Sequence, residues 1–229
     1  MKADRTIGVI GTLVWDRILD RDRRSEPVEE WGGIGYALAA LRSTLPDGWK
    51  VMPILKLGRD LAEDGRHFLN EIPGLSDTGL VVVPEPNNRV ELRYLDRALR
   101  VERLTGGVPS WTWPELAPLV ELCDALYVNF ISGFEMTLET ALALRTVYKR
   151  PTYADLHSLF LSMNQHGQRV PRSLEAWSTW LRCFDAVQMN ENEFDLLSTT
   201  GDPWQLAAGA LGPELKLITV TLGARGAAY

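Results

Sequence analysis

The sequence predicts an α/β fold of three layers around a mostly parallel central sheet, with a small second sheet beside it. The first observation is that short apolar runs alternate with segments of helical periodicity along most of the chain. The second is that these runs are apolar throughout, which is typical of strands buried on both faces. The third is a stretch near residue 90 where apolar and polar residues nearly alternate, which indicates strands with one face in water.

The size and charge of the chain narrow its class. It has 229 residues, of which 45% are hydrophobic, and a formal net charge of -6. That length allows one sizeable domain. The acidic balance argues against nucleic-acid binding, which needs a basic surface. No run approaches the ~18 apolar residues of a membrane span, and the first residues lack the pattern of a signal peptide. We therefore expect a cytoplasmic protein that binds neither nucleic acid nor membrane.

The first half of the chain contains two strand–helix pairs. Residues 6–11 form an apolar run that ends in glycine, which predicts a buried strand. Residues 34–45 carry leucines at helical spacing and stop before Pro46, which predicts a helix. The second pair is expected as a strand over 51–57 and a helix over 60–72.

The segment 80–104 has a different pattern. A run of valines is followed by a turn rich in proline and asparagine, and then by the near-alternation of Val90, Leu92 and Tyr94 with their neighbours. The highly charged stretch that begins after residue 16 offers strands to pair with it. We expect a small exposed sheet, the lid, formed by about 14–31 and 80–104.

The strand–helix alternation returns in the second half, which predicts βαβ units and a parallel sheet. The expected elements are strands over 125–130, 151–156, 186–189 and 215–222, and helices over 136–148, 174–181 and 191–197.

Ligands of such sheets lie at the C-terminal ends of the strands. Polar residues and glycines at or soon after those ends are therefore the candidates for a site: Asp16, Gly32, Gly33, Gly58, Asn129, Asp155, Asn190, Glu193 and Gly223. Of these, we take Asp16, Gly32, Gly33 and Asn129 as substrate-binding residues.

Two of these features suit a hydroxylated ligand. The Asp16 carboxylate has two acceptor oxygens and could receive hydrogen bonds from two hydroxyls; the alternative is a solvated loop aspartate. Gly32 and Gly33 precede a helix, so the backbone can approach a ligand closely and the first helical N–H groups are free. The alternative there is a simple turn and helix start.

Two later motifs suit a nucleotide with its metal. Asn190 and Glu193 stand between a strand and a helix, where they would organise Mg²⁺-bound water near phosphates; their spacing equally fits a capping box. Thr221, Gly223 and Gly226 follow a strand and would line a nucleotide pocket. The alternative for them is a tight turn without a ligand.

Other chemistries find little support. The chain has no GxGxxG fingerprint and no P-loop lysine. The histidines (His67, His157 and His166) show no metal-ligand spacing and are interpreted as ordinary surface or core residues. The sequence shows no pattern that indicates a Ser-His-Asp catalytic triad. The two cysteines, Cys123 and Cys183, are far apart and indicate buried free thiols.

In order and spacing, the chain from residue 6 onward resembles the ribokinase-like, PfkB-type carbohydrate kinases. The motifs that carry the resemblance are the first strand with Asp16, the Gly32-Gly33 turn, Leu57-Gly58-Arg59-Asp60 with Gly65 and Leu69, Asn190 to Glu193, and Thr221 to Gly226. The segment 80–104 falls where that family carries its β-lid.

The resemblance implies transfer of the ATP γ-phosphoryl group to a hydroxymethyl group of a sugar-like acceptor. Asp16 and Gly33 would face the acceptor. Asn190 and Glu193 would serve the Mg²⁺–phosphate region, with Glu193 acting on the metal through water. Thr221 and Gly223 would lie beside the nucleotide. A homodimer formed through the lid is a further implication.

Two positions depart from the family pattern. Ala37 stands where the family usually has an asparagine, so the acceptor is expected to be atypical. The family's Gly-Ala-Gly-Asp element, which supplies the phosphate cradle and the aspartate base, would lie beyond Gly226, and the sequence holds none. We therefore expect a single ribokinase-like domain over 1–229 that is incomplete at its C-terminus and has no useful kinase activity by itself. The alternative is a catalytically degenerate binding or regulatory protein of the same fold.

Overall fold

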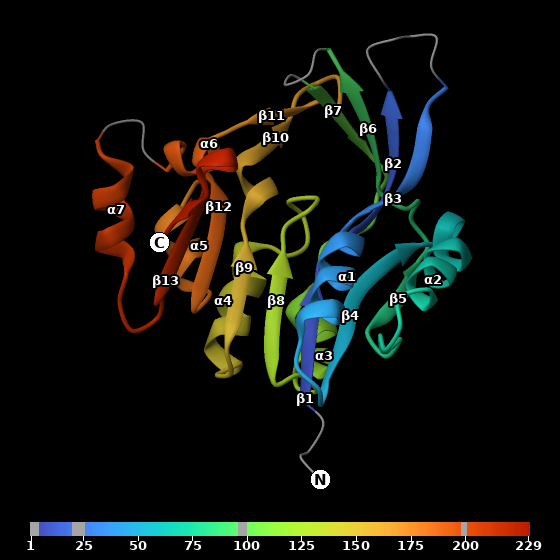
Figure 1. Cartoon of the computed structure of the whole chain (residues 1–229), viewed down its shortest axis with the longest axis horizontal. Coiled ribbons are helices and arrows are strands. Elements are labelled where there is room, and N and C mark those ends of the chain that lie inside the picture. The colour runs from blue at the N-terminus through green and yellow to red at the C-terminus, as the bar shows by residue number, and fades with distance from the viewer. Residues whose placement is uncertain (1–4, 20–25, 96–99, 198–200) are drawn as a thin grey trace.

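A computed structural model describes residues 5–19, 26–95, 100–197 and 201–229 of the chain (Figure 1). Eight strands form the central sheet in the order β14-β13-β12-β9-β8-β1-β4-β5. Every neighbouring pair is parallel except β13 and β14. The strands are β1 (Arg5–Ile10), β4 (Trp49–Gly58), β5 (Leu80–Val83), β8 (Ala125–Asn129), β9 (Thr152–Asp155), β12 (Ala186–Asn190), β13 (Leu217–Thr221) and β14 (Ala227–Ala228).

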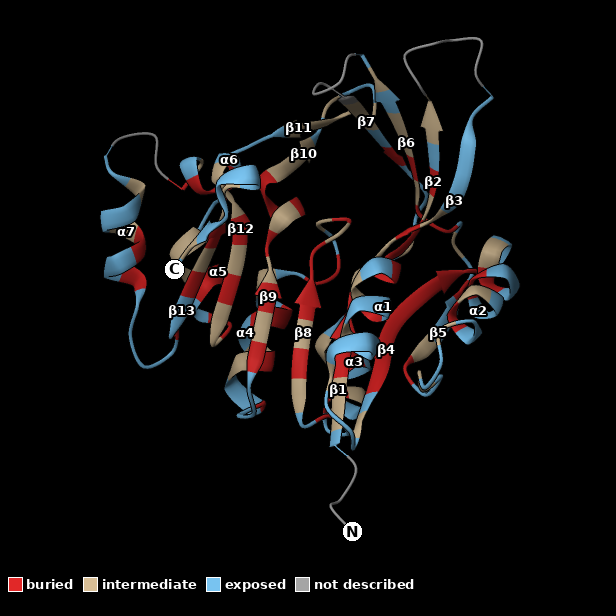
Figure 2. Ribbon diagram, viewed as in Figure 1, coloured by how far each residue is buried: buried red, intermediate tan, exposed pale blue. Residues whose placement is uncertain are grey.

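Helices pack on both faces of this sheet. On one face, α1 (Ile34–Thr44) and α2 (Ala62–Asn70) bury Leu38 and Leu69 against β1 and β4. On the other face lie α3 (Trp113–Val120), α4 (Leu138–Val147) and α5 (Trp177–Arg182), whose buried side chains form the larger core (Figures 1 and 2). Two further helices, α6 (Glu191–Asp195) and α7 (Pro203–Ala210), lie between β12 and β13 in the sequence. The three-layer α/β/α class predicted from the sequence is thus confirmed.

The lid is a four-stranded sheet in the order β3-β2-β6-β7. Its strands are β2 (Leu13–Leu19), β3 (Val28–Gly33), β6 (Arg89–Tyr94) and β7 (Arg100–Thr105). It stands above the C-terminal ends of the central strands (Figure 1). Val14, Val90 and Leu104 form a small buried cluster on one face of the lid, and Ile131 of the main domain packs against it.

One boundary expected for the lid is wrong. Leu80–Val83, which we assigned to the lid, forms β5, pairs in parallel with β4 and closes the edge of the central sheet. The physical reason lies in its pattern: four apolar residues in succession suit a parallel strand, whereas lid strands need one polar face. In this part of the chain the lid begins only at Arg89.

The connection between the central sheet and the lid centres on Asn87, which is fully buried. Its side-chain oxygen accepts a hydrogen bond from the Gly58 N–H at 3.0 Å, and its amide group donates to the Leu13 carbonyl at 3.1 Å. Its own N–H donates to the Asp60 carboxylate at 2.7 Å. One side chain therefore ties the end of β4 to the start of β2.

A second connection was not expected from the sequence. The hairpin of β10 (Leu161–Met163) and β11 (Arg169–Pro171) reaches from the main domain to β7 (Figure 1). The Leu104 N–H donates to the Gly167 carbonyl at 3.2 Å, and the Arg169 guanidinium pairs with Glu102 of the lid at 3.6 Å. The hairpin thus fastens the lid to the main domain at a second place.

Smaller features complete the description. Helices α3 and α7 were not predicted, and the helix expected over 174–181 begins only at Trp177. Both cysteines are buried free thiols, as the sequence indicated. Within the described ranges, no helix combines the length and the apolar character that crossing a membrane requires.

Candidate functional site

The parallel register brings several candidate residues to one edge of the central sheet. Asn129 pairs with Asp155 across β8 and β9, and Asn190 pairs with Thr221 across β12 and β13. Gln188 on β12 is opposite Asp155. Because the C-terminal ends of parallel strands share an edge, these residues lie in a row along one edge of the central sheet.

Asp16 belongs to the lid rather than to this row. It lies on β2 and is only 9% exposed. Its carboxylate occupies the space that a side chain at Gly32, on the neighbouring strand β3, would fill. The sequence predicted that Asp16 and Gly32 belong to one site, and the structure places them in direct contact.

Gly33 joins the lid to α1. Its φ of 63° is a left-handed conformation that favours glycine. A Cβ at this position would lie 2.6 Å from the Thr12 carbonyl oxygen, which also accepts the first hydrogen bond from α1 through the Ile34 N–H at 3.1 Å. The chain can make this close turn only with glycine.

Asn129 ends β8 and is 7% exposed. Its amide nitrogen donates to the Tyr127 hydroxyl at 3.0 Å. Its amide oxygen is buried and has no hydrogen-bond partner within the described part of the chain. Burial raises the pKa of Tyr127 above its usual range, so its hydroxyl stays protonated. A buried acceptor without a partner is costly, so this oxygen has an unused capacity to accept a hydrogen bond.

The loop after β8 is held by Glu135, which the sequence analysis did not single out. This buried carboxylate accepts hydrogen bonds from the N–H groups of Ser132 and Gly133, at 2.6 and 3.0 Å. It also accepts from the Thr12 hydroxyl at 2.7 Å. Glu135 therefore links this loop to the connection between β1 and β2. The contact with Thr12 joins residues more than 120 positions apart in the sequence, so no local pattern predicts it.

Asn190 and Glu193 form the capping box that their spacing predicts. The Glu193 N–H donates to the Asn190 side-chain oxygen at 3.0 Å, and the Asn190 N–H donates to the Glu193 carboxylate at 2.8 Å. The same carboxylate also accepts from the Asn190 amide group. The structure thus shows the capping role directly, and a role toward Mg²⁺ stays a prediction.

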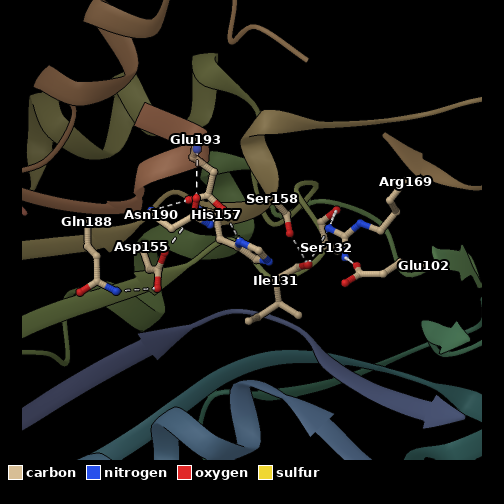
Figure 3. Close-up of polar contacts among 10 residues, drawn as sticks. All are labelled: Glu102, Ile131, Ser132, Asp155, His157, Ser158, Arg169, Gln188, Asn190 and Glu193. Carbon is tan, nitrogen blue, oxygen red and sulfur yellow. Dashed lines mark hydrogen bonds and ion pairs between the residues drawn. The ribbon is translucent and has the colours of Figure 1, made fainter. Parts of the chain in front are cut away.

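His157 was interpreted as an ordinary histidine, but it belongs to this cluster (Figure 3). Its Nδ1 lies 2.6 Å from Oε1 of Glu193. Burial by itself would lower the pKa of His157, but the hydrogen bond and charge of Glu193 outweigh it, so the pKa is raised. The neighbouring Asp155 accepts from the Gln188 amide at 3.1 Å, and burial raises its pKa.

Thr221, Gly223 and Gly226 follow at the next strand. Gly223 and Gly226 have φ values of 58° and 93°, and a Cβ at either would meet open space. The glycines therefore serve the turn, whose Leu222 N–H donates to the Gly226 carbonyl at 2.8 Å. Arg225 pairs with Glu191 of α6, which holds this turn against the Asn190 cap.

Gly58 is a further sequence candidate that the structure places apart from this row. Its Cα lies against the backbone of Pro86 and Asn87, so a side chain there would collide with the chain itself. The glycine is needed for the packing of the lid connection rather than for a ligand.

No protein-family model matches the sequence, and no curated protein matches it. Solved structures do resemble it in three dimensions. One is a pyrophosphate-dependent kinase in the ribokinase family, at 19% identity and a TM-score of 0.72 over 94% of this chain and 72% of that one. A ribokinase from Thermotoga maritima matches at 17% identity and a TM-score of 0.69, over 97% of this chain and 73% of that one. A Burkholderia thailandensis nucleoside kinase in complex with inosine matches at 15% identity and a TM-score of 0.69, over 97% of this chain and 71% of that one. The chain therefore has a ribokinase-like fold.

Proposed function

We propose that this chain carries the substrate-binding edge of an ATP-dependent kinase that phosphorylates a hydroxymethyl group of a sugar or sugar-like small molecule. The observation that supports this most is that Asn129 and the Asn190–Glu193 cap share the C-terminal edge of the central sheet, while the lid, which carries Asp16, stands above the C-terminal ends of these strands. The similar structures are kinases of the ribokinase family, which supports the same class of reaction.

On the acceptor side, Asp16 would accept hydrogen bonds from two neighbouring hydroxyls, because a carboxylate offers two acceptor oxygens. The unpartnered Asn129 oxygen would accept a third. Gly32 and Gly33 leave room for the ligand close to the backbone. Ala37 contributes no polar group, so the chain would recognise its acceptor with fewer side-chain contacts than the family pattern provides.

On the donor side, Glu193 has one oxygen that fits a hydrated Mg²⁺. One oxygen, Oε1, is contacted by His157 and by the Asn190 amide, and the other accepts from the Asn190 N–H. One acceptor position remains on Oε2, which suits a single water of a hydrated Mg²⁺. The open space beside Gly223 and Gly226 suits a nucleotide near Thr221.

The chemistry would be mainly positioning and charge stabilisation, as in other phosphoryl transfers. When bound, Mg²⁺ neutralises charge on the donor phosphates. The residues of this chain hold the acceptor hydroxyl between Asp16 and Asn129 and limit the access of water through the lid. We further propose that the protein is cytoplasmic and that two copies associate through their lids.

The test is equilibrium binding by calorimetry with ribose, fructose, inosine and myo-inositol, the last two being ligands of similar structures. We expect one of these to bind, and Asp16→Asn to weaken it about tenfold or more because a charge-assisted hydrogen bond is lost. Glu29→Gln, on an exposed part of β3, is the matched control.

The outcomes separate the two functional hypotheses. Binding of both an acceptor and ATP supports the kinase. Binding of the acceptor without ATP binding supports the regulatory or binding protein. If no polyol binds, or if Asp16→Asn binds as tightly as the wild type, the assignment of this edge as an acceptor site fails.

A further inference from the structure

We propose that His157 is a phosphate-contacting residue of the donor site, and that it binds a phosphoryl oxygen through Nε2. This inference deepens the proposed function and rests on it. It concerns a residue that shows no motif in the sequence, and it is argued from the way the imidazole is held and from what surrounds it.

The ring is fixed by Glu193. The Nδ1–Oε1 distance is 2.6 Å, and the Glu193 side chain is only 9% exposed. A carboxylate can only accept, so Nδ1 carries the hydrogen of this contact. The Glu193 carboxylate is itself immobilised by Asn190. The imidazole therefore has one orientation in which Nε2 is the atom left for a ligand.

Nε2 lies on the other side of the ring from Nδ1, which contacts Glu193. Figure 3 shows the ring extending from Glu193 toward the side where Ile131 lies. The next residue, Ser158, confirms this proximity: its N–H donates to the Phe130 carbonyl at 3.0 Å and its hydroxyl to the Ile131 carbonyl at 2.7 Å. Within the described residues no hydrogen bond to Nε2 is formed, and the side chain is 40% exposed.

His157 lies at the end of the strand between the acceptor and donor candidates. His157 follows β9, which lies in the sheet between β8, with the acceptor candidate Asn129, and β12, with the donor candidate Asn190. A group that moves from donor to acceptor must pass over the end of this middle strand. The histidine is therefore placed where both substrates meet.

The other cations near this edge are engaged elsewhere. Arg169 donates to the Ile131 and Ser132 carbonyls, at 2.9 and 3.3 Å, and pairs with Glu102. Arg225 pairs with Glu191. The charged groups that act on His157 are Glu193, Asp155 and Arg169. A ring that donates Nδ1–H to Glu193 and Nε2–H to a phosphoryl oxygen is the imidazolium cation, since both nitrogens donate only in that form. A cation held between a carboxylate and a phosphate is a favourable charge-assisted arrangement.

A purely structural role would be different: His157 would only steady Glu193 through Nδ1. Two substitutions separate the roles. In His157→Asn the side-chain amide replaces Nδ1, which keeps the Glu193 contact and removes Nε2. In His157→Gln the longer side chain places its amide near Nε2 and gives up the Nδ1 position. His166→Asn, an exposed histidine in the turn between β10 and β11, is the matched control.

The experiment is calorimetric titration of the full chain and these variants with ATP and with pyrophosphate, each with Mg²⁺, after thermal unfolding has shown that each variant is folded. We expect His157→Asn to bind the donor about ten- to a hundredfold more weakly than the wild type. His157→Gln should bind more tightly than His157→Asn, and His166→Asn should match the wild type.

Two results would contradict the inference. If His157→Asn binds the donor as tightly as His157→Gln or more tightly, the Nε2 contact is overturned while the proposed function stands. If the wild type binds neither ATP nor pyrophosphate, the kinase proposal and this inference both fail.

Discussion

The Asp16 carboxylate lies against the Cα of Gly32 on the adjacent lid strand, in the volume that a side chain at position 32 would need. Gly32 therefore leaves room for the Asp16 carboxylate, in addition to its place before the turn. Because Asp16 is nearly buried, its orientation depends on this neighbour. The pair explains why an aspartate and a glycine separated by 15 residues would act as one unit.

Gly32→Ala tests this relationship. The added methyl group must displace the carboxylate, so we expect acceptor affinity to fall about as far as in Asp16→Asn, while the fold is kept. Calorimetry with the bound polyol measures the first effect and thermal unfolding the second. Acceptor binding unchanged from the wild type would show that the carboxylate does not need this space.

Asn87 provides a prediction about stability. Replacing it by alanine leaves the buried Gly58 N–H and Leu13 carbonyl without their partner. We expect Asn87→Ala to lower the free energy of unfolding by about 3 kcal/mol. Urea denaturation measures this, with Asn70→Ala, at an exposed helix end, as the control. Equal stability of the two variants would contradict the view that Asn87 anchors the lid.

Some elements of this fold could be predicted from the sequence and others could not. The parallel strands of the main domain were predictable because burial on both faces leaves continuous apolar runs, as in β1 and β4. Asn190 ends β12 as the sequence indicated, whereas Asp16, expected soon after the first strand, lies in the middle of β2. The Leu80–Val83 strand was misplaced because only a short turn separates this edge strand of the central sheet from the lid strand that begins at Arg89.

The residues that escaped prediction act over long sequence distances. Glu135 holds Thr12, and His157 meets Glu193 36 positions later. Their chemistry depends on which strands become neighbours, and that is set by the strand order rather than by local spacing. A lone histidine in a sequence without metal-ligand spacing gives no sign of such a partner.

Acid should weaken the contact between Lys56 and Glu115. Lys56 is buried, and its ammonium lies 2.9 Å from the Glu115 carboxylate. A hydrogen bond from the Thr112 N–H, supported by Lys56, lowers the pKa of Glu115 from 4.5 to about 2. A carboxyl whose pKa is lowered on folding stabilises the protein above its unfolded pKa and loses that effect as the pH falls toward the folded value.

The measurement is the free energy of unfolding of the wild type and Glu115→Gln at about pH 6 and about pH 3. We expect the variant to be less stable at the higher pH, and the gap to narrow at the lower one. Glu121→Gln, at an exposed position beyond α3, should show no such change. A gap that is the same at both values would contradict the assigned contact.

Association through the lid can be tested at its edge. β3 is an outer strand of the lid, and Val28 at its start is 55% exposed. Exposed apolar edges favour pairing with another chain. We expect the wild type to sediment as a dimer and Val28→Lys as a monomer, whereas Val147→Lys, equally exposed on α4, should remain dimeric. A monomeric wild type would refute the proposed dimer.

The most direct test of the central claim is a crystal structure with the polyol that binds most tightly in solution. The account predicts that hydroxyls of the ligand contact the Asp16 carboxylate and the amide oxygen of Asn129 beneath the lid. A ligand bound elsewhere would contradict it, for example in the 470 Å³ hollow lined by Trp15, Trp31 and Phe68.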